Sequence, residues 1–203
     1  MTGLTDLIDD ERAGIDEIGA YLDGLDGDAR WREVAQLGRT RQRALYDKAA
    51  HAPAIDMAHF VGEARPREEV IHDGVNTLPL PTPWRRFQKR FCRPADSRVA
   101  RLFGYNEGPT RRVIGPGFFV ALSTAERPQW SARGGVVVDY YQVPDGAVAE
   151  GWPRVVANDW RLQRFVYDQT RDFMRRVSRH VSIGAAYKRE RPLDHYFTLC
   201  RQA

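Results

Sequence analysis

Two side chains that can transfer protons, Asp139 and His195, stand in segments whose residues alternate between apolar and polar. Asp139 interrupts the apolar run 136–141. A carboxylate inside such a run either faces solvent or is buried with a partner. If Asp139 and His195 share one face of a sheet, they can act as a general acid–base pair. Whether the protein is an enzyme stays open; for that alternative, the sequence predicts Asp139, His195 and Glu107 as the catalytic residues.

A turn-rich segment, 104–112, carries a phenol, a carboxylate and two guanidinium groups, which belong to Tyr105, Glu107, Arg111 and Arg112. Arginine pairs can bind a carboxylate or a phosphate through parallel hydrogen bonds. Aromatic residues with a few convergent polar groups are typical of a small-molecule pocket. We therefore predict a ligand site that is formed by Arg111, Arg112, Tyr105, Tyr140 and Tyr196.

The sequence indicates no metal site and no identifiable cofactor. It has no HExxH motif and no paired CxxC motif, which are the usual zinc-binding patterns. Two cysteines, Cys92 and Cys200, are too few for a disulfide framework. Cys92 lies between arginines that would favour a reactive thiolate, but we interpret both cysteines as buried apolar residues.

The net charge of +4 is a small difference between two larger charges. Residues 1–30 carry −7 and the remaining residues carry +11. This division predicts that an acidic N-terminal helix docks on a basic surface, within the chain or in a homo-oligomer. Of the 31 basic residues, 28 are arginine, an excess that is typical of bacterial proteins from GC-rich genomes. Many of them stand beside acids, so we expect no nucleic-acid partner.

The apolar runs are too short to span a membrane, and the acidic start differs from a secretory signal. We therefore expect a cytoplasmic protein without a membrane partner.

The first half of the chain is predicted to be mainly helical. Apolar residues recur at helical spacing over 4–25 and again over 29–50. A short helix is expected near 68–73, and the prolines of 78–83 predict an extended connector before a basic helix over 84–91. We expect a helical segment over 1–77, a connector over 78–94 and a core over 95–203, integrated into one domain.

The second half is predicted to have the order β-β-α-β-β. Strands are expected over 112–122 and 135–143, a long amphipathic helix over 159–179, and a hairpin over 181–187 and 194–201. The predicted fold class is therefore α+β, with an antiparallel sheet packed against one long helix.

This arrangement favours a small-molecule-binding module whose ligand is small and, as one option, anionic. Two alternatives stay open: an enzyme that uses Asp139 and His195 at the same place, and an interaction module in which the acidic helix docks on a basic surface.

Overall fold

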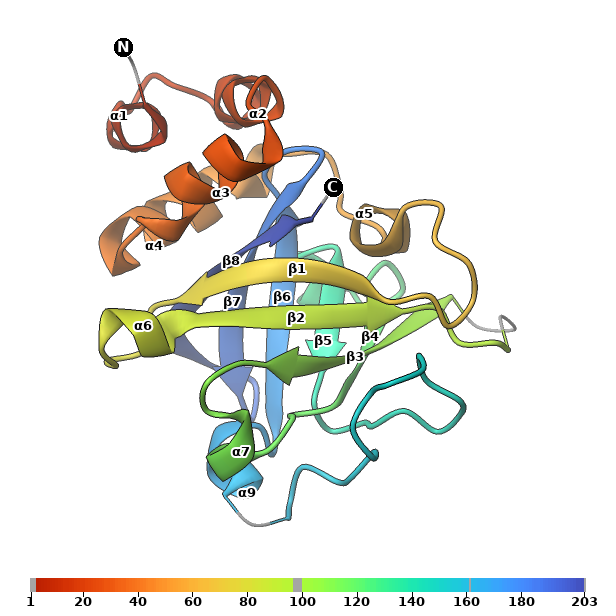
Figure 1. Cartoon of the computed structure of the whole chain (residues 1–203). Helices are drawn as coiled ribbons and strands as arrows, with labels where there is room; N and C mark the ends of the chain where they lie inside the picture. Colours follow the sequence, from red (N-terminus) through yellow and green to blue (C-terminus); the bar gives the residue numbers. More distant parts are fainter. Residues whose placement is uncertain (1–2, 97–99, 161, 203) are drawn as a thin grey trace.

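The computed structural model describes residues 3–96, 100–160 and 162–202. Eight antiparallel strands form a closed barrel, in which each strand pairs with the next and β8 pairs with β1 (Figure 1). The strands are β1 (Val70–Asn76), β2 (Arg86–Cys92), β3 (Arg101–Glu107), β4 (Phe119–Ser123), β5 (Val136–Asp139), β6 (Thr170–Arg176), β7 (Val181–Lys188) and β8 (Arg191–Arg201). Among the described strands, closure gives every strand a partner on both edges.

The connections of this up-and-down barrel divide into two sets. The β1–β2, β3–β4, β5–β6 and β7–β8 connections all lie at one end of the barrel, which we call the open end. Three short helices belong to these connections: α6 (Thr82–Arg85), α7 (Arg111–Ile114) and α9 (Gln163–Val166) (Figure 1). The opposite end, which we call the closed end, carries α8 (Pro128–Ser131) in the β4–β5 connection.

Aromatic rings and glycines fill the barrel interior together. Gly104, on β3, lies so close to the Phe119 ring that a Cβ there would be 2.2 Å from it. Gly184, on β7, lies equally close to the Phe197 ring, at 2.3 Å. Both rings belong to the hydrophobic core inside the barrel. These glycines therefore allow large side chains to fit into a narrow barrel.

Helix α5 (Met57–Val61) closes the barrel at its closed end. Its Phe60 is fully buried and packs on Phe91 of β2, with ring centroids 4.9 Å apart. His72 of β1 donates a hydrogen bond from Nε2 to the Phe60 carbonyl oxygen, at 2.8 Å. The interior is therefore solidly packed at this end.

The N-terminal helices cover part of the outer wall of the barrel. They are α1 (Leu4–Asp9), α2 (Ile15–Asp23), α3 (Gly27–Ala35), α4 (Arg39–Lys48) and the short 3₁₀ helix η1 (Ala49–His51). Their apolar side chains form one cluster with Val181, Ile183 and Cys200 of β7 and β8. Asp9 on α1 pairs with Arg41 on α4 at 2.7 Å, so the acidic first helix docks within its own chain.

The predicted α+β fold is wrong, because the sheet closes into a barrel and the part of the chain that the structure describes has no long helix packed on it. The predicted helix over 159–179 is replaced by the four-residue α9 and the strand β6. Gln169, which has a φ of +59°, separates them. On β6 the inward Asp172 and Met174 alternate with the outward Phe173, and apolar residues on both faces imitate a helical pattern.

Two other predicted helices are also strands. The predicted basic helix over 84–91 is largely β2, in which Phe87, Lys89 and Phe91 point inward at a spacing of two. The helix expected near 68–73 is the start of β1. The predicted strand over 112–122 begins as α7 and becomes β4 only at Phe119.

Other expectations are confirmed. The antiparallel C-terminal hairpin is formed by β7 and β8, and β5 lies within the predicted 135–143 strand. Arg189 and Glu190 form the hairpin turn with φ values of +51° and +64°, as a two-residue turn of the type I′ kind requires. In the described part of the chain, no helix has the length and apolar character needed to cross a membrane.

Candidate ligand-binding site

A cavity of about 300 Å³ enters the barrel from its open end. The wall is mainly apolar and aromatic, and it is contributed by several strands and by the open-end connections. Its apolar and aromatic lining includes Leu78, Leu80, Trp84, Phe87, Ile114, Tyr140, Val166, Tyr167, Leu193, Tyr196 and Phe197. A concave, largely apolar site of this size suits a small organic molecule.

Four polar side chains meet at the inner end of this cavity, and we call them the buried cluster: Lys89, Asn106, Tyr140 and Asp172. Lys89 Nζ lies 3.1 Å from Asn106 Oδ1 and 3.1 Å from Asp172 Oδ2, and it also donates to the Tyr140 hydroxyl. The Tyr140 hydroxyl lies 3.2 Å from Asp172 Oδ2. Strands β2 and β6 stand on opposite sides of the eight-strand ring, so the Lys89–Asp172 pair spans the interior.

Aromatic rings surround the Lys89 ammonium group. Nζ lies 4.8 Å from the Phe197 ring centroid and 4.9 Å from those of Phe119 and Tyr140. Burial lowers the pKa of Lys89, which the charge of Asp172 opposes, and burial raises the pKa of Asp172, which Lys89 opposes. A fully buried lysine is rare unless it is paired, and such a perturbed pair in a cavity marks a candidate functional site.

The segment Gly115-Pro116-Gly117 holds Asn106 in the buried cluster. The Asn106 amide Nδ2 donates to the Gly117 carbonyl at 3.1 Å, and its backbone N–H donates to Pro116. Gly117 has a φ of +55°, and a Cβ there would lie 2.5 Å from the Tyr167 ring. Glycine is therefore required at this position both for its conformation and for space.

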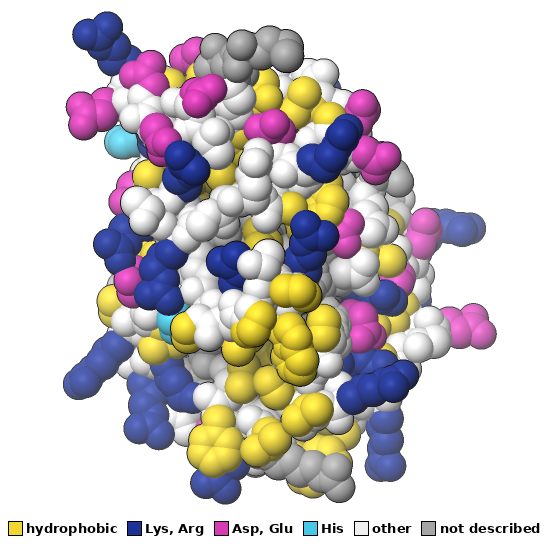
Figure 2. Space-filling view, turned by 60° about the vertical axis from the view of Figure 1, so that its left-hand side comes forward, with side chains coloured by type: hydrophobic (Ala, Val, Ile, Leu, Met, Phe, Trp, Pro, Cys, Tyr) yellow, Lys and Arg dark blue, Asp and Glu magenta, His cyan; other side chains and the backbone are white. Residues whose placement is uncertain are grey.

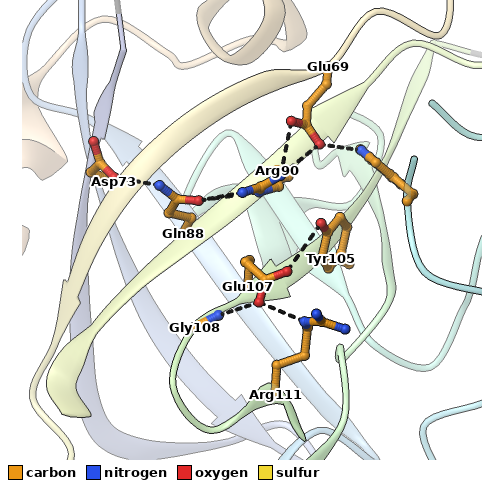
Figure 3. Close-up of polar contacts among 9 residues, drawn as sticks. Glu69, Asp73, Gln88, Arg90, Tyr105, Glu107, Gly108 and Arg111 are labelled. Carbon is orange, nitrogen blue, oxygen red and sulfur yellow. Dashed lines mark hydrogen bonds and ion pairs between the residues drawn. The ribbon is translucent and has the colours of Figure 1, made fainter. Parts of the chain in front are cut away.

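Three predicted site residues, Tyr105, Glu107 and Arg111, lie together at the rim and the outer wall (Figure 3). The Glu107 carboxylate accepts from Arg111 Nε at 2.6 Å and from the Gly108 N–H at 3.0 Å. The Tyr105 hydroxyl lies 3.5 Å from Glu107, while its ring packs outside the barrel on Phe118. Glu107 and Arg111 border the cavity mouth, but each already has a partner.

Polar contacts continue along the outer faces of β1 and β2 (Figure 3). Arg90 donates to Glu69 at 3.1 Å and to Gln88 at 2.8 Å, and Gln88 donates to Asp73 at 3.0 Å. Gln88 and Arg90 point away from the cavity, because they alternate with the inward Lys89 on β2. They stabilise the wall and do not line the cavity.

The structure does not bring Asp139 and His195 together. Asp139 is buried on the outer face of β5, where it pairs with Arg171 at 3.2 Å. His195 lies on the inner face of β8 at the cavity mouth, and its Nδ1 is 3.4 Å from Arg39 Nη2. Three strand pairings separate β5 from β8. An acid–base pair of these two residues has no support from this arrangement.

The other three predicted ligand residues, Tyr140, Tyr196 and Arg112, lie in three different parts of the molecule. Tyr140 belongs to the buried cluster, and Tyr196 lies at the cavity edge with its ring 5.6 Å from that of Tyr46 on α4. Arg112 is exposed on α7 at the open end. Burial raises the pKa of Cys92 and of Cys200 to about 11, which disfavours a reactive thiolate at either position.

Lys89 and Asp172, which anchor the buried cluster, were not among the residues predicted from the sequence. The sequence patterns predict Lys89 in the basic helix over 84–91 and Asp172 in the long amphipathic helix over 159–179. One signal was present in the sequence: Lys89 is one of only three lysines, and it is flanked two residues away by Phe87 and Phe91. A charged residue between two inward aromatics at strand spacing indicates a buried charge.

Comparisons with known proteins identify no relative whose function could be compared with this site. Compared with protein-family models, curated proteins and solved structures, the chain gives no significant match. Among the described residues, no group of three or more His, Cys, Asp or Glu side chains could hold a metal ion. The buried cluster and the apolar cavity therefore carry the functional argument.

Proposed function

We propose that the barrel binds a small, mainly apolar molecule in its open-end cavity, with one polar group of the ligand contacting the buried cluster. The observation that carries this proposal is a lysine–aspartate pair, 3.1 Å apart, at the inner end of an otherwise apolar cavity. Eight-stranded antiparallel barrels are often ligand-binding proteins, and their interior has room for one small ligand.

The charge balance of the buried cluster favours a neutral polar group on the ligand. Lys89 and Asp172 neutralise each other, so a carboxylate brought to them would be buried without a counter-charge. A hydroxyl or a carbonyl could exchange hydrogen bonds with Lys89 and Tyr140. An anionic end of a ligand would instead meet Arg86 and Arg111 at the mouth.

Displacement of a neutral fluorescent probe, N-phenylnaphthylamine, tests the proposal. We expect the protein to bind the probe, and medium-chain alkanols to displace it more strongly than alkanoates of equal length. The variant Ala186→Trp fills the cavity from β7, where Ala186 lines it, and should abolish probe binding. Ala20→Trp, at an exposed position on α2, is the matched control.

Equal probe binding by the Ala186→Trp variant and by the control would contradict the proposal. Native mass spectrometry of protein purified from its source provides a second, independent measurement. A retained small molecule should be present in the original protein and absent from the Ala186→Trp variant.

A further inference from the structure

Large hydrophobic side chains are exposed almost entirely at the open end. The described part of the chain has nine such residues, with exposed fractions between 37% and 67%. All nine lie in, or within three residues of, the open-end connections. We call six of them the apolar rim: Leu80, Trp84, Val113, Leu162, Phe165 and Leu193.

The apolar rim is continuous with the mouth of the cavity. Leu80, Trp84 and Leu193 also line the cavity, and Phe165 precedes the lining residue Val166 on α9. Figure 2 shows hydrophobic side chains gathered on this side of the molecule, with Lys and Arg side chains beside them. A contiguous exposed apolar patch bordered by polar residues is typical of an interaction surface.

Basic residues accompany the apolar rim. Segments 77–86, 107–118, 159–169 and 188–195 contain nine Lys or Arg residues and five acids, a net charge of +4. Two of these acids, Glu190 and Asp194, pair with arginines outside the four segments. Arg86, Arg112, Arg164 and Arg191, which we call the basic ring, are exposed.

We infer that the open end docks on the surface of an anionic lipid bilayer. The apolar rim would enter the boundary between headgroups and acyl chains, and the basic ring would meet the anionic headgroups. Such a contact needs no membrane-spanning segment. It would also place the cavity mouth at the depth of the acyl chains, so that an apolar ligand could enter without crossing water.

Charge complementarity favours a bilayer over a second copy of the chain. If two open ends met face to face, each basic ring would lie against the other, and like charges in contact are unfavourable. An anionic bilayer supplies both an apolar layer and the opposite charge. This inference goes beyond ligand binding and does not depend on it.

Co-sedimentation with vesicles tests the inference on the full-length chain. The lipids are phosphatidylcholine alone, or an equimolar mixture with phosphatidylglycerol. We expect binding to the anionic vesicles, weak binding to the neutral ones, and release from the anionic vesicles at high salt. The apolar-rim variant Trp84→Ser/Phe165→Ser and the basic-ring variant Arg112→Glu/Arg164→Glu should each bind about tenfold more weakly.

A matched charge control distinguishes the basic ring from general electrostatic attraction. Arg12 and Arg32 are exposed on the N-terminal segment, and Arg12→Glu/Arg32→Glu makes the same change in net charge as the basic-ring variant. We expect this control to bind anionic vesicles within about twofold of the original chain. Circular dichroism verifies that all variants remain folded.

Three results would overturn the inference: no binding of the original chain to anionic vesicles, an equal loss in the charge control, or a dimer in light scattering that the apolar-rim variant dissociates. The last result would identify a second copy as the occupant of the open end. The cavity-filling variant Ala186→Trp should still bind vesicles, so a failure of ligand binding is separable from a failure of docking.

Discussion

Lys89 Nζ and Asp172 Oδ2 lie 3.1 Å apart, and the two side chains are only 2% and 7% exposed. They reach each other from opposite walls of the barrel, β2 and β6. Desolvation of two charges is costly, and their attraction compensates for that cost only when both are present. The pair therefore joins the two walls and forms the polar inner end of the cavity.

Removing one partner of this pair should be more harmful than removing both. We expect Lys89→Met to lower the free energy of unfolding by about 3–5 kcal/mol, because it leaves Asp172 buried without a counter-charge. The double variant Lys89→Met/Asp172→Leu should recover most of that loss. Urea unfolding followed by circular dichroism measures both values. A double variant as unstable as the single one would show that the pair is not coupled as the geometry indicates.

A substitution at Asp139 should affect stability without affecting the cavity. Asp139→Asn weakens the ion pair with Arg171 on the outer wall, and we expect a loss of about 1–2 kcal/mol in the free energy of unfolding. Affinity for N-phenylnaphthylamine should stay unchanged, because Asp139 does not line the cavity. A large loss of probe affinity in this variant would show that Asp139 contributes to ligand binding.

Acid should destabilise the closed end of the barrel. Burial lowers the pKa of His72 to about 4 from an ordinary value of 6.5, and burial also holds the pKa of His59 well below that value. Since the unfolded chain binds these protons first, stability is retained above pH 6.5 and is lost as pH falls from 6.5 towards 4. His72 alone should contribute about 2 kcal/mol of loss between pH 7.5 and pH 5.

Urea unfolding at pH 7.5 and at pH 5 measures this dependence. The variant His72→Asn should show a smaller loss between the two pH values than the original chain does. His51→Gln, at an exposed position, is the control and should leave the dependence unchanged. Equal pH dependence in all three chains would exclude His72 as its source.

Glycine at position 104 should be essential for the shape of the interior. A Cβ at this position would lie 2.2 Å from the Phe119 ring and 2.6 Å from the Arg90 carbonyl oxygen. We expect Gly104→Ala to lower the free energy of unfolding by about 1–3 kcal/mol through overpacking. It should also weaken probe binding, because Phe119 would be displaced towards Lys89. Gly27→Ala, with no atom within 4 Å of the new Cβ, should cause no loss in thermal unfolding.

The local periodicity of apolar residues predicts several helices and strands, but it does not predict that the sheet closes into a barrel. The helical character of the N-terminal region and the C-terminal hairpin are visible in the sequence, because each buries one face. The helices expected over 4–25 and 29–50 are each divided into two shorter helices. Barrel closure depends on β1 pairing with β8, about 120 residues away, and no local periodicity contains that information. Strands β2 and β6 were predicted as helices because their charged residues, Lys89 and Asp172, lie inside the barrel.

The candidate site was predicted in part for a related reason. Glu107 and Arg111 were predicted because they stand in the turn-rich segment 104–112, and Tyr140 because it stands in the apolar run 136–141. All three line the cavity. Lys89 resembles its arginine neighbours in charge, and its lysine type and the flanking Phe87 and Phe91 are the local signals that distinguish it. Whether Lys89 and Asp172 point inward follows from strand register, which the barrel determines.

The contact between the N-terminal helices and the last two strands sets the order in which the molecule can fold. Residues 4–49 are synthesised well before the strands on which their apolar faces pack, which begin at Val181. The same late segment supplies β8, without which the barrel cannot close on β1. Until β7 and β8 have been synthesised, the apolar faces of the early helices are accessible to chaperones and to aggregation. Folding of this protein therefore depends on contacts between distant parts of the sequence, which form slowly.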